Sequence, residues 1–431
     1  MRGINVGLIG FGTVGTGVVK ILKEKQTLLR NKTGTNIILR KICDKDIKSK
    51  RAISVDESLL TTDPDQIIRD PQIDIVIELI GGIHPAKEYI IEALKNGKHI
   101  ITANKALLAE EGKELFLIAK QHKLSIYFEA SVGAGIPIIK SIREGLVANR
   151  FLSILGILNG TSNFILTKMS KENLSFKEAL QEAKRKGFAE KDPTLDIQGI
   201  DSAHKLILLI YLCFGRLINL EDIFVEGISN ISNIDLIYAK EMGWDIKLLA
   251  IAKKEAQELE VRVHPTLIPQ DHLLSSVKGI FNAIYLSSDL INELLFYGPG
   301  AGQMPAASAV VSDLVDLVQN IKAGLFKPQL EVIQDSSIQR LKNISEIESR
   351  YYIRFMAIDK PGVLAKISGL LGKYQISIAS VNQKERKKQK VVPVVMLTHE
   401  AKEKNFKEAL SRISKLDVIK EKPVAIRIEE L

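Results

Sequence analysis

The chain has 431 residues, of which 45% are hydrophobic, and a formal net charge of +9. This length exceeds what one hydrophobic core ordinarily serves, so two or three domains are expected. The lysines and arginines are spread along the chain and aromatic residues make up only 6% of it, which argues against a nucleic-acid-binding surface with interleaved basic and stacking residues. Anionic small molecules suit the charge better.

The cysteines and the hydropathy pattern point to a reducing compartment. Cys43 and Cys213 lie far apart in apolar surroundings. The chain shows no signal peptide and no uncharged apolar stretch long enough to span a membrane. We therefore expect a soluble cytoplasmic protein without a membrane partner.

The chain opens with an apolar strand from Ile4 that runs into Gly10-x-Gly12-x-x-Gly15, followed by a helix over 18–29. In this context the first glycine allows a tight turn, the second lets the backbone approach a pyrophosphate, and the third lets helix and strand pack closely. The helix N-terminus adds the positive end of its dipole. The stretch predicts a dinucleotide-binding site.

The second strand, 37–42, ends at Cys43 and Asp44. An acid at this distance would bind the ribose hydroxyls and favour NAD, whereas Arg40 or Lys41 could pair with the 2′-phosphate of NADP. The residues leave this choice open, and either group could merely end an exposed strand. A further strand at 73–80 and a helix at 86–95 continue the alternation, which predicts a doubly wound parallel sheet.

Two later loops carry candidate site residues. Lys105 follows a strand that begins at His99, at the end of the sheet where open α/β folds bind ligands. A strand at 125–129 leads into a run of small residues, 130–137, whose carbonyls could face a hard cation with Glu129 as the single anion. The residues alone favour a hinge between domains here.

From about residue 138 the pattern predicts a mixed α/β domain, with strands near 151–158, 223–228 and 259–268 and a helix over 174–187. A polar turn, 159–163, could contact a ligand, although capping of the next helix is the default interpretation. The stretch Gly187–Lys205 then places Asp201 and Lys205 one turn apart at the start of an apolar helix. Taken alone, that pair fits a surface ion pair.

The remainder contains one more glycine-rich turn and a separate tail. The turn 297–305 includes Gly302 and precedes a helix over 306–321; it either shapes the helix start or brings the backbone close to a ligand. Residues 331–349 are polar and predict a linker. Residues 351–428 predict the βαββαβ order of a ferredoxin-like unit.

Five blocks together resemble the signature blocks of homoserine dehydrogenase, in that family's order. They are Gly10-Phe11-Gly12-Thr13-Val14-Gly15, Thr102-Ala103-Asn104-Lys105, Glu129 to Pro137, Asn159-Gly160-Thr161-Ser162-Asn163, and Gly187 to Lys205. The tail resembles an ACT domain, and the whole resembles the monofunctional form. Two departures are Ala306, where the family pattern has threonine, and Asn382, which interrupts an otherwise ACT-like segment.

The resemblance implies interconversion of aspartate 4-semialdehyde and homoserine with NAD or NADP. It implies Lys205 as proton donor, Lys105 as a second site lysine with the division of labour between them open, and Asp201 as an acid of the site. Substrate-binding residues would be Glu190, Asp196 and Thr161. Cofactor-binding residues would be Gly10, Phe11, Gly12, Thr13, Val14, Gly15, Ala103, Lys105 and Gly302, together with Arg40 from the strand reading. The Glu129 stretch becomes a sodium site with the carbonyls of Val132, Ala134 and Ile136.

The expected architecture is a Rossmann nucleotide domain (1–135), a substrate and dimerisation domain (136–305), a returning helix (306–330), a linker (331–349) and an ACT regulatory domain (350–431). An amino-acid effector, with threonine as the hypothesis, is expected at the turn 359–363, and the assembly is expected to be a homodimer or homotetramer. Two alternatives remain: a catalytically silent sensor of nucleotide and amino acids, and another semialdehyde or hydroxy-acid dehydrogenase. The second requires a nucleophilic cysteine or a histidine pair, which Cys43 and Cys213 do not supply.

Overall fold

The computed structural model describes residues 3–325, 335–384 and 391–431. They form two compact units. Of the described residues, unit 1 comprises 3–151, 204–220, 288–325 and 335, and unit 2 comprises 152–203, 221–287, 336–384 and 391–431. The helix over residues 200–214 therefore begins in unit 2 and continues in unit 1.

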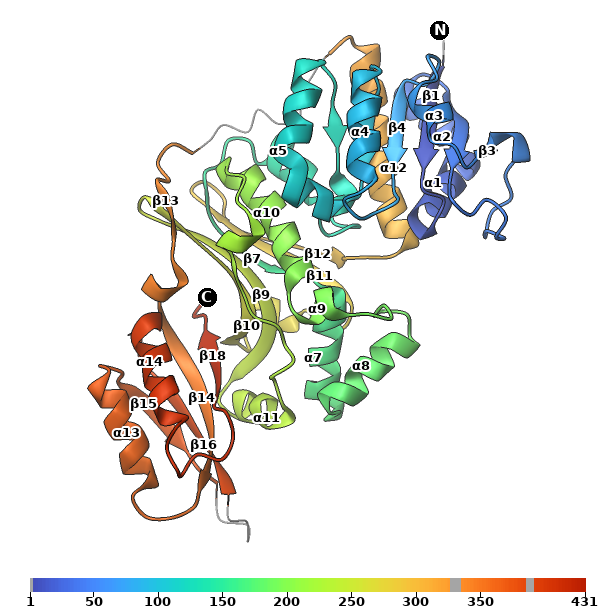
Figure 1. The fold of residues 1–431 in the computed structure, drawn as a ribbon. Helices are drawn as coiled ribbons and strands as arrows, with labels where there is room; N and C mark the ends of the chain where they lie inside the picture. The colour runs from blue at the N-terminus through green and yellow to red at the C-terminus, as the bar shows by residue number, and fades with distance from the viewer. Residues whose placement is uncertain (1–2, 326–334, 385–390) are drawn as a thin grey trace. The chain divides into compact units, whose positions relative to one another are not determined.

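Unit 1 contains a parallel sheet in the order β3-β2-β1-β4-β5-β6 (Figure 1). Its strands are β1 (Ile4–Ile9), β2 (Ile37–Cys43), β3 (Leu60–Thr61), β4 (Ile75–Glu78), β5 (His99–Thr102) and β6 (Ile126–Tyr127). Its helices include α1 (Thr13–Glu24), α2 (Gln26–Thr33), α3 (Asp65–Ile68), α4 (Ala86–Lys95), α5 (Lys105–Gln121), α6 (Ile138–Lys140) and α12 (Gln303–Lys322). The strand β12 (Asn292–Pro299) also belongs to unit 1. This is the predicted doubly wound sheet.

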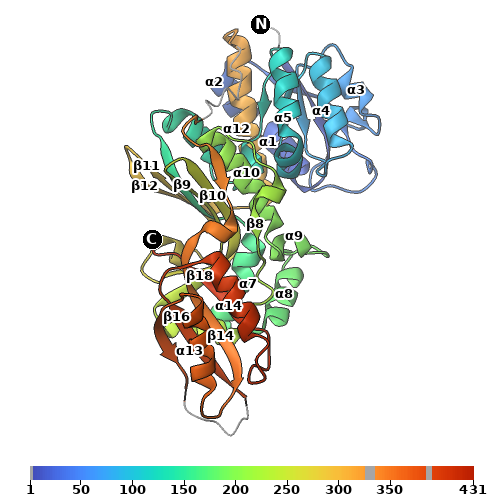
Figure 2. The same cartoon turned by 60° about the vertical axis from the view of Figure 1, so that its left-hand side comes forward.

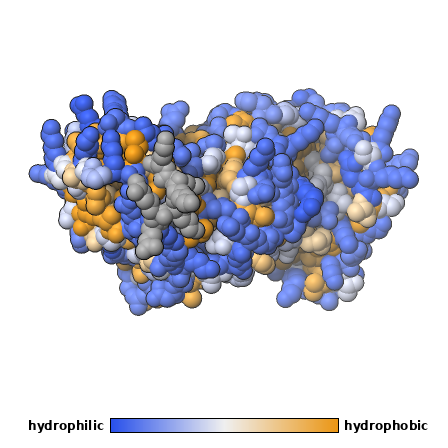
Figure 3. All heavy atoms as spheres, turned by 90° about the horizontal axis from the view of Figure 1, so that it is seen from below, coloured by the Kyte–Doolittle hydropathy of each residue, from blue (hydrophilic) through white to orange (hydrophobic). Residues whose placement is uncertain are grey.

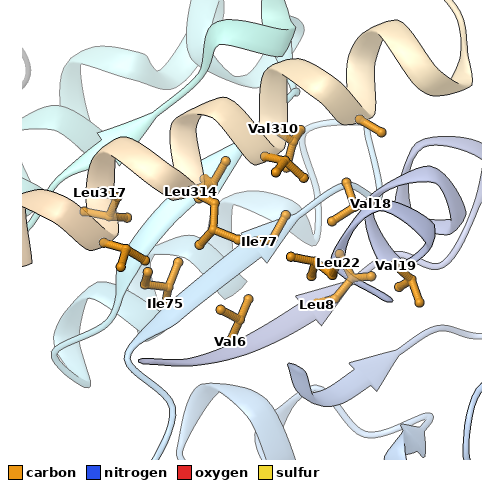
Figure 4. Packing of buried hydrophobic residues seen from close by; sticks show 14 of the residues in the cluster. Val6, Leu8, Val18, Val19, Leu22, Ile75, Ile77, Val310, Leu314 and Leu317 are labelled. Carbon is orange, nitrogen blue, oxygen red and sulfur yellow. The ribbon is translucent and has the colours of Figure 1, made fainter. Parts of the chain in front are cut away.

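The core of unit 1 lies between the central strands and two helices that are nearly 300 residues apart in the chain. Side chains of β1 and β4, among them Leu8 and Ile77, meet Val18 of α1 and Val310 and Leu314 of α12 (Figure 4). α1 and α12 approach closely because Gly17 has no side chain: a Cβ there would lie 2.8 Å from the Cβ of Ala307. α12 thereby seals one face of the sheet.

The predicted boundaries of three elements in unit 1 were wrong. The first helix begins at Thr13 rather than at residue 18, and a separate helix, α2, begins at Gln26. Glycine has a low helix propensity, which disfavours a helix over Gly15 and Gly17. In the folded chain the close packing at these two glycines outweighs that cost, so the helix includes them. The strands β4 and β6 are shorter than 73–80 and 125–129 because the ends of these two segments leave the sheet.

Unit 2 is built on a mixed sheet that includes the order β11-β7-β9-β10-β18-β14-β16-β15. Its first part comprises β7 (Phe151–Ile157), β8 (Phe224–Val225), β9 (Trp244–Glu255), β10 (Glu258–Pro269) and β11 (Phe281–Ser288), with α7 (Gly160–Glu172), α8 (Phe176–Arg185), α9 (Thr194–Ile197), the start of α10 (Ile200–Phe214) and α11 (Asn233–Glu241). β9 and β10 form a long antiparallel hairpin.

The tail has the predicted βαββαβ order. Its elements are β14 (Glu348–Ile358), α13 (Val363–Lys373), β15 (Ile378–Asn382), β16 (Val391–Thr398), β17 (Ala401–Lys402), α14 (Glu403–Ile413) and β18 (Val424–Ile428). Figure 2 shows α13 and α14 on one face of its strands. The helices and strands enclose a core that includes Tyr351, Phe355, Ile367 and Phe406.

The tail continues the sheet of the middle part instead of following it as a detached domain. β18 pairs antiparallel with β14 and parallel with β10, where Thr266 faces Arg427 and Leu267 faces Ile428. The expected linker, 331–349, also contains a strand, β13 (Arg340–Lys342), that pairs in parallel with β10. This part of the stretch forms a strand despite its polar composition, because its backbone pairs with β10. Residues 326–334 lie outside the described chain.

The surface agrees with the composition. On the face drawn in Figure 3, hydrophilic residues predominate and hydrophobic ones lie between them in separate groups. Among the described residues, none of the helices is long and apolar enough to cross a membrane.

Candidate active site

The glycine loop of unit 1 has the geometry of a dinucleotide site. Gly10 has a φ of +105°, and a Cβ at Gly15 would lie 2.1 Å from the carbonyl oxygen of Gly10, so neither position accepts a side chain. A Cβ at Gly12 would meet no atom within 4 Å. Gly12 therefore borders open space at the N-terminus of α1, which starts at Thr13 with Val14 next, and a pyrophosphate fits there on geometric and electrostatic grounds.

The acid after β2 lies beside this loop. The Phe11 N–H donates to a carboxylate oxygen of Asp44 at 2.6 Å. Arg51, which the sequence analysis did not single out, donates from Nε to the Phe11 carbonyl at 2.8 Å, and its guanidinium lies over the Phe11 ring and 3.8 Å from Asp44. The only sequence feature that could have identified Arg51 as a site residue is its positive charge in the loop that follows Asp44.

Arg40 is placed differently. It lies inside β2, three residues before that strand ends, and its guanidinium donates to the side chain of Gln72. The structure brings Asp44 and Arg51 to the glycine loop, and it places Arg40 on the exposed part of the strand.

The loop before Lys105 is organised by a buried acid, Glu78, at the end of β4. Glu78 accepts from the Thr102 hydroxyl at 2.7 Å and from the Ile80 N–H at 2.7 Å. Burial raises the pKa of Glu78. Asn104 caps α5 through the Leu107 N–H and donates to the Gly82 carbonyl at 2.5 Å. Ala103 and Lys105 are thus held at the carboxyl end of the sheet. The sequence feature that could have identified Glu78 is an acidic residue at the end of an apolar strand.

Lys205 lies in the second turn of α10 and is 7% exposed. Within unit 1, α10 contacts α5 at two points: His204 Nε2 is 3.4 Å from a carboxylate oxygen of Glu110, and the Tyr211 and Phe116 rings stack at 5.8 Å. Both contacts advance in the same chain direction, so the two helices run in parallel. The lysines at their starts, Lys105 and Lys205, consequently lie toward the same end of the helix pair.

In unit 2, one amide holds two acids of the Gly187–Lys205 stretch. The Asn159 side-chain nitrogen donates to Asp196 at 2.7 Å and to Asp201 at 2.8 Å, and its oxygen caps α7 through the Ser162 N–H at 2.8 Å. The expected capping role of this turn is confirmed. The same residue also ties together two acids that are 37 and 42 positions away.

The two other predicted substrate-binding residues lie in different surroundings. The Thr161 hydroxyl donates to the Phe188 carbonyl at 2.6 Å and thereby holds the start of the Gly187–Lys205 stretch. Glu190 is exposed. An exposed carboxylate is suited to a ligand ammonium group.

The Glu129 stretch in unit 1 is buried and turned by positive φ values at Gly133 and Ala134. The Glu129 carboxylate accepts the Ile139 and Lys140 N–H groups at 2.9 and 2.8 Å, and its own N–H donates to Asp313 at 2.8 Å. Burial raises the pKa of Glu129 to about 7 and also raises that of Asp313. Two neighbouring buried acids suit a cation, with carbonyls of Val132, Ala134 and Ile136 in the adjoining turn. No cluster of three or more His, Cys, Asp or Glu side chains suited to a metal occurs in the described residues.

The turn before α12 reaches the glycine loop from the far end of unit 1. Gly302 has a φ of +124° and caps α12, and the Gln303 side chain donates to the Thr13 carbonyl at 3.1 Å. Ala306, the departure from the family pattern, is buried in the first turn of that helix. The glycine-rich turn therefore brings its backbone beside the predicted cofactor site.

Comparison with known proteins gives consistent results over the whole chain. Three family models match: a homoserine dehydrogenase NAD-binding domain at 10–129, a homoserine dehydrogenase domain at 137–315 and an ACT domain at 351–418. The homoserine dehydrogenase of Bacillus subtilis is 40% identical over 100% of this chain and 99% of its own length, and that of Neisseria gonorrhoeae is 42% identical over 100% of both.

Solved structures agree. The crystal structure of a homoserine dehydrogenase from Thiobacillus denitrificans matches with a TM-score of 0.92 and 42% identity, covering 100% of this chain and 99% of that one. A hyperthermophilic archaeal homoserine dehydrogenase in complex with NADPH matches with a TM-score of 0.62 and 27% identity, covering 77% of this chain and 100% of that one.

Proposed function

This chain belongs to the homoserine dehydrogenase family, and we propose that Lys205 transfers the proton at the substrate's C4 oxygen. The enzyme interconverts L-homoserine and L-aspartate 4-semialdehyde with a nicotinamide cofactor. A silent sensor or a cysteine-dependent dehydrogenase is excluded by this membership. The observation that carries the proposal is that α10 bears Asp201 in its first turn and Lys205 in its second.

The acids serve substrate binding. Homoserine carries an ammonium group, and a carboxylate that accepts its N–H bonds gives a charge-assisted interaction. Asn159 keeps Asp196 and Asp201 oriented by donating one hydrogen to each. Glu190 supplies a further exposed carboxylate, and Thr161 holds the segment that precedes it. Asp201 then places the substrate one helical turn before Lys205.

The lysines serve the chemistry. During homoserine oxidation the O–H bond at C4 breaks and its proton passes to the neutral amine of Lys205; in the reverse direction the Lys205 ammonium returns it to the aldehyde oxygen. The bound nicotinamide supplies the redox chemistry by accepting or donating the hydride at C4. Lys105, held at the start of α5, stabilises negative charge on the same oxygen.

The test is homoserine-dependent reduction of NAD and NADP by the wild type and by Lys205→Ala, Lys105→Ala and the exposed-surface control Lys113→Ala. We expect kcat to fall by about 10²–10⁴-fold in Lys205→Ala, as for loss of a general acid or base, with the melting temperature and the Lys113→Ala kinetics unchanged. Full activity of Lys205→Ala would falsify its role. A larger loss in Lys105→Ala than in Lys205→Ala would assign the proton to Lys105.

For the cofactor we propose that NADP is used and that Arg51 recognises its 2′-phosphate. Arg51 reaches both the glycine loop and Asp44, so it offsets the negative charge by which Asp44 alone would favour NAD. Support comes also from the archaeal relative, whose structure contains NADPH. The contacts of Gly10 to Gly15, Ala103, Lys105 and Gly302 with the cofactor are part of the same proposal.

We further propose a sodium ion at Glu129 with the carbonyls of Val132, Ala134 and Ile136. The buried acids Glu129 and Asp313 support it, because a cation beside them would offset their mutual repulsion. Its test is independent of turnover: sodium chloride should raise the melting temperature above that in equimolar choline chloride, and Glu129→Gln should abolish the difference. Equal melting temperatures of the wild type in both salts would remove sodium from the site.

The ACT domain is proposed to regulate the enzyme through an amino acid, with threonine as the first candidate. A homodimer or homotetramer and a cytoplasmic location stay predictions. Saturating L-threonine should change turnover or the oligomeric state measured by light scattering. No change in either would rule out threonine as the effector.

A further inference from the structure

Two buried asparagines join the polar turn 159–163 to a much later segment of unit 2. The Asn282 side chain, on β11, donates from Nδ2 to the Leu158 carbonyl at 2.8 Å, across 124 positions of chain. The Asn163 side chain, on α7, donates from Nδ2 to the Phe281 carbonyl at 3.1 Å, across 118 positions. The two hydrogen bonds therefore join the same pair of segments in opposite directions.

Residues 277–281 lie along one face of α7. A Cβ on Gly160, where the helix begins, would lie 2.7 Å from a carbonyl oxygen of this segment, so the two backbones meet there. Asn163 follows about one turn later, and one turn after that the Thr167 hydroxyl oxygen accepts the Gly279 N–H at 3.0 Å. Helix positions spaced by three and four share a face. Positions 160, 163 and 167 therefore form a continuous strip against the segment.

The segment is itself anchored to the sheet of unit 2. Lys247 of β9 is 3% exposed, and its side-chain nitrogen donates to the Val277 carbonyl at 2.5 Å. At its other end the segment enters β11, which is a strand of the same sheet. Because a packed sheet moves little, it gives the turn 159–163 a fixed reference.

The Leu158 carbonyl precedes the residue that orients two of the proposed substrate-binding acids. Asn159 donates to Asp196 at 2.7 Å and to Asp201 at 2.8 Å. One short amide can reach two carboxylates only while its own backbone is held in place. The hydrogen bond from Asn282 holds the peptide group that joins Leu158 to Asn159, and the helix cap holds the other side of Asn159.

Stability alone does not account for the two buried asparagines. Both side chains face carbonyl oxygens, so the amide nitrogen has to be the atom on that side. Within the described part of the chain, the Oδ1 atoms of Asn163 and Asn282 have no hydrogen-bond partner. A buried polar atom without a partner costs stability, and an apolar side chain of the same outline would avoid that cost.

We propose that Asn282 is a positioning residue for homoserine binding: by holding the Leu158 carbonyl it fixes Asn159, and thereby both acids that Asn159 orients. Asn163 holds the opposite side of the same contact. The inference rests on the proposed substrate-binding role of these acids, and it extends the site to β11, which lies outside the blocks that carried the family resemblance. Loss of the contact should raise KM for homoserine more than it lowers kcat, because it orients groups that bind the substrate and not those that transfer the proton or the hydride.

The test measures homoserine oxidation by Asn282→Leu, Asn163→Leu and the control Asn233→Leu. Leucine has the same branching of side-chain heavy atoms as asparagine but cannot donate. We expect KM to rise by about tenfold in the first two variants, as for the loss of one buried hydrogen bond. Asn233 is a matched control: it donates to the Asn173 carbonyl at 2.8 Å, past the opposite end of α7, and its Oδ1 is likewise buried without a partner among the described residues. Its variant should keep the wild-type KM.

A double-mutant cycle with Asn159→Ala tests the route of the effect. If Asn282 acts through Asn159, the double variant should have about the same KM as Asn159→Ala alone, whereas independent effects multiply. Multiplied effects overturn the proposal. It is also overturned if Asn282→Leu lowers kcat and the melting temperature while KM stays unchanged, since that pattern belongs to a purely structural residue. Asn163→Leu carries the test if Asn282→Leu fails to fold.

Asp201→Asn separates this inference from the substrate-binding proposal on which it rests. A raised KM in Asp201→Asn together with a wild-type KM in Asn282→Leu and Asn163→Leu defeats this inference alone. A wild-type KM in Asp201→Asn defeats the substrate-binding proposal, and this inference with it.

Discussion

The side-chain amide of Asn159 donates to the Asp201 carboxylate at 2.8 Å, across 42 residues of chain. The same nitrogen donates to Asp196, so one amide keeps two acids apart and oriented. Neither acid can rotate freely toward solvent while this contact persists. The orientation of these two proposed substrate-binding acids thus depends on a residue from a different block.

Asn159→Ala is expected to lower kcat/KM for homoserine by about 10–100-fold, chiefly through KM, because each acid loses a buried donor worth roughly 1–3 kcal/mol. Asn159→Asp is the matched control, since it keeps an oxygen to cap α7 but repels both acids. If the aspartate variant restores wild-type KM in steady-state assays, Asn159 acts only as a helix cap.

The glycine loop permits a paired test. Gly12→Ala has room and an ordinary φ of −75°, so the melting temperature should be unchanged while NADP affinity falls, because the methyl group enters the pyrophosphate space. Gly15→Ala collides with the Gly10 carbonyl and should lower both stability and affinity. Thermal melts and fluorescence titration with NADPH measure the two effects. Undiminished NADPH binding by Gly12→Ala would contradict the cofactor placement.

Arg51→Ala is expected to reduce kcat/KM with NADP by about tenfold or more while affecting NAD less, since only the 2′-phosphate loses its charge-assisted partner. Arg40→Ala is the comparison, and its mid-strand position predicts little effect on either cofactor. If Arg40→Ala is instead the variant with reduced kcat/KM for NADP, Arg40 binds the 2′-phosphate, as its place near the end of the second strand suggested from sequence.

Lys247 predicts a pH dependence of stability. Burial, with Lys278 nearby, lowers the pKa of Lys247 to about 7, and its ammonium nitrogen lies 2.5 Å from the Val277 carbonyl. Between pH 7 and the ordinary lysine pKa near 10.5, the unfolded chain binds the proton that the folded chain has released. Stability should therefore rise with pH across this window. Lys247→Met should flatten the rise in urea-unfolding free energy; parallel curves would contradict the assignment.

Asp235→Ala should destabilise the protein by roughly 3–5 kcal/mol, because it leaves the buried guanidinium of Arg354 without its carboxylate. Asp235 is fully buried on α11 and accepts from Arg354 at 2.7 Å and from the Tyr352 hydroxyl at 3.1 Å, which joins the middle part to the ACT domain. Glu241→Ala, which removes an exposed partner of Lys384, should cost less than about 1 kcal/mol in the same urea titrations. Similar losses in both variants would contradict the buried link.

The sequence alone determined the features that depend on local chemistry. Gly10, Gly12 and Gly15 signal a nucleotide loop because a tight turn and a close backbone approach exclude side chains. The alternation of strands and helices, and the βαββαβ tail, follow from short-range hydropathy patterns. The block Gly187–Lys205 is acidic and ends at Lys205, and its order among the other blocks carried the family resemblance.

Tertiary structure decided which distant groups meet. Arg51 reaches Phe11 across 40 residues, β18 joins the sheet through β10, and residues 277–281 lie along α7. Such contacts depend on strand register and on the path of the chain, which short-range patterns do not encode. The start of the first helix was predicted too late for the same reason. Gly15 packs against Gly10 and Gly17 against Ala307, and the contact with Ala307 exists only in the folded chain.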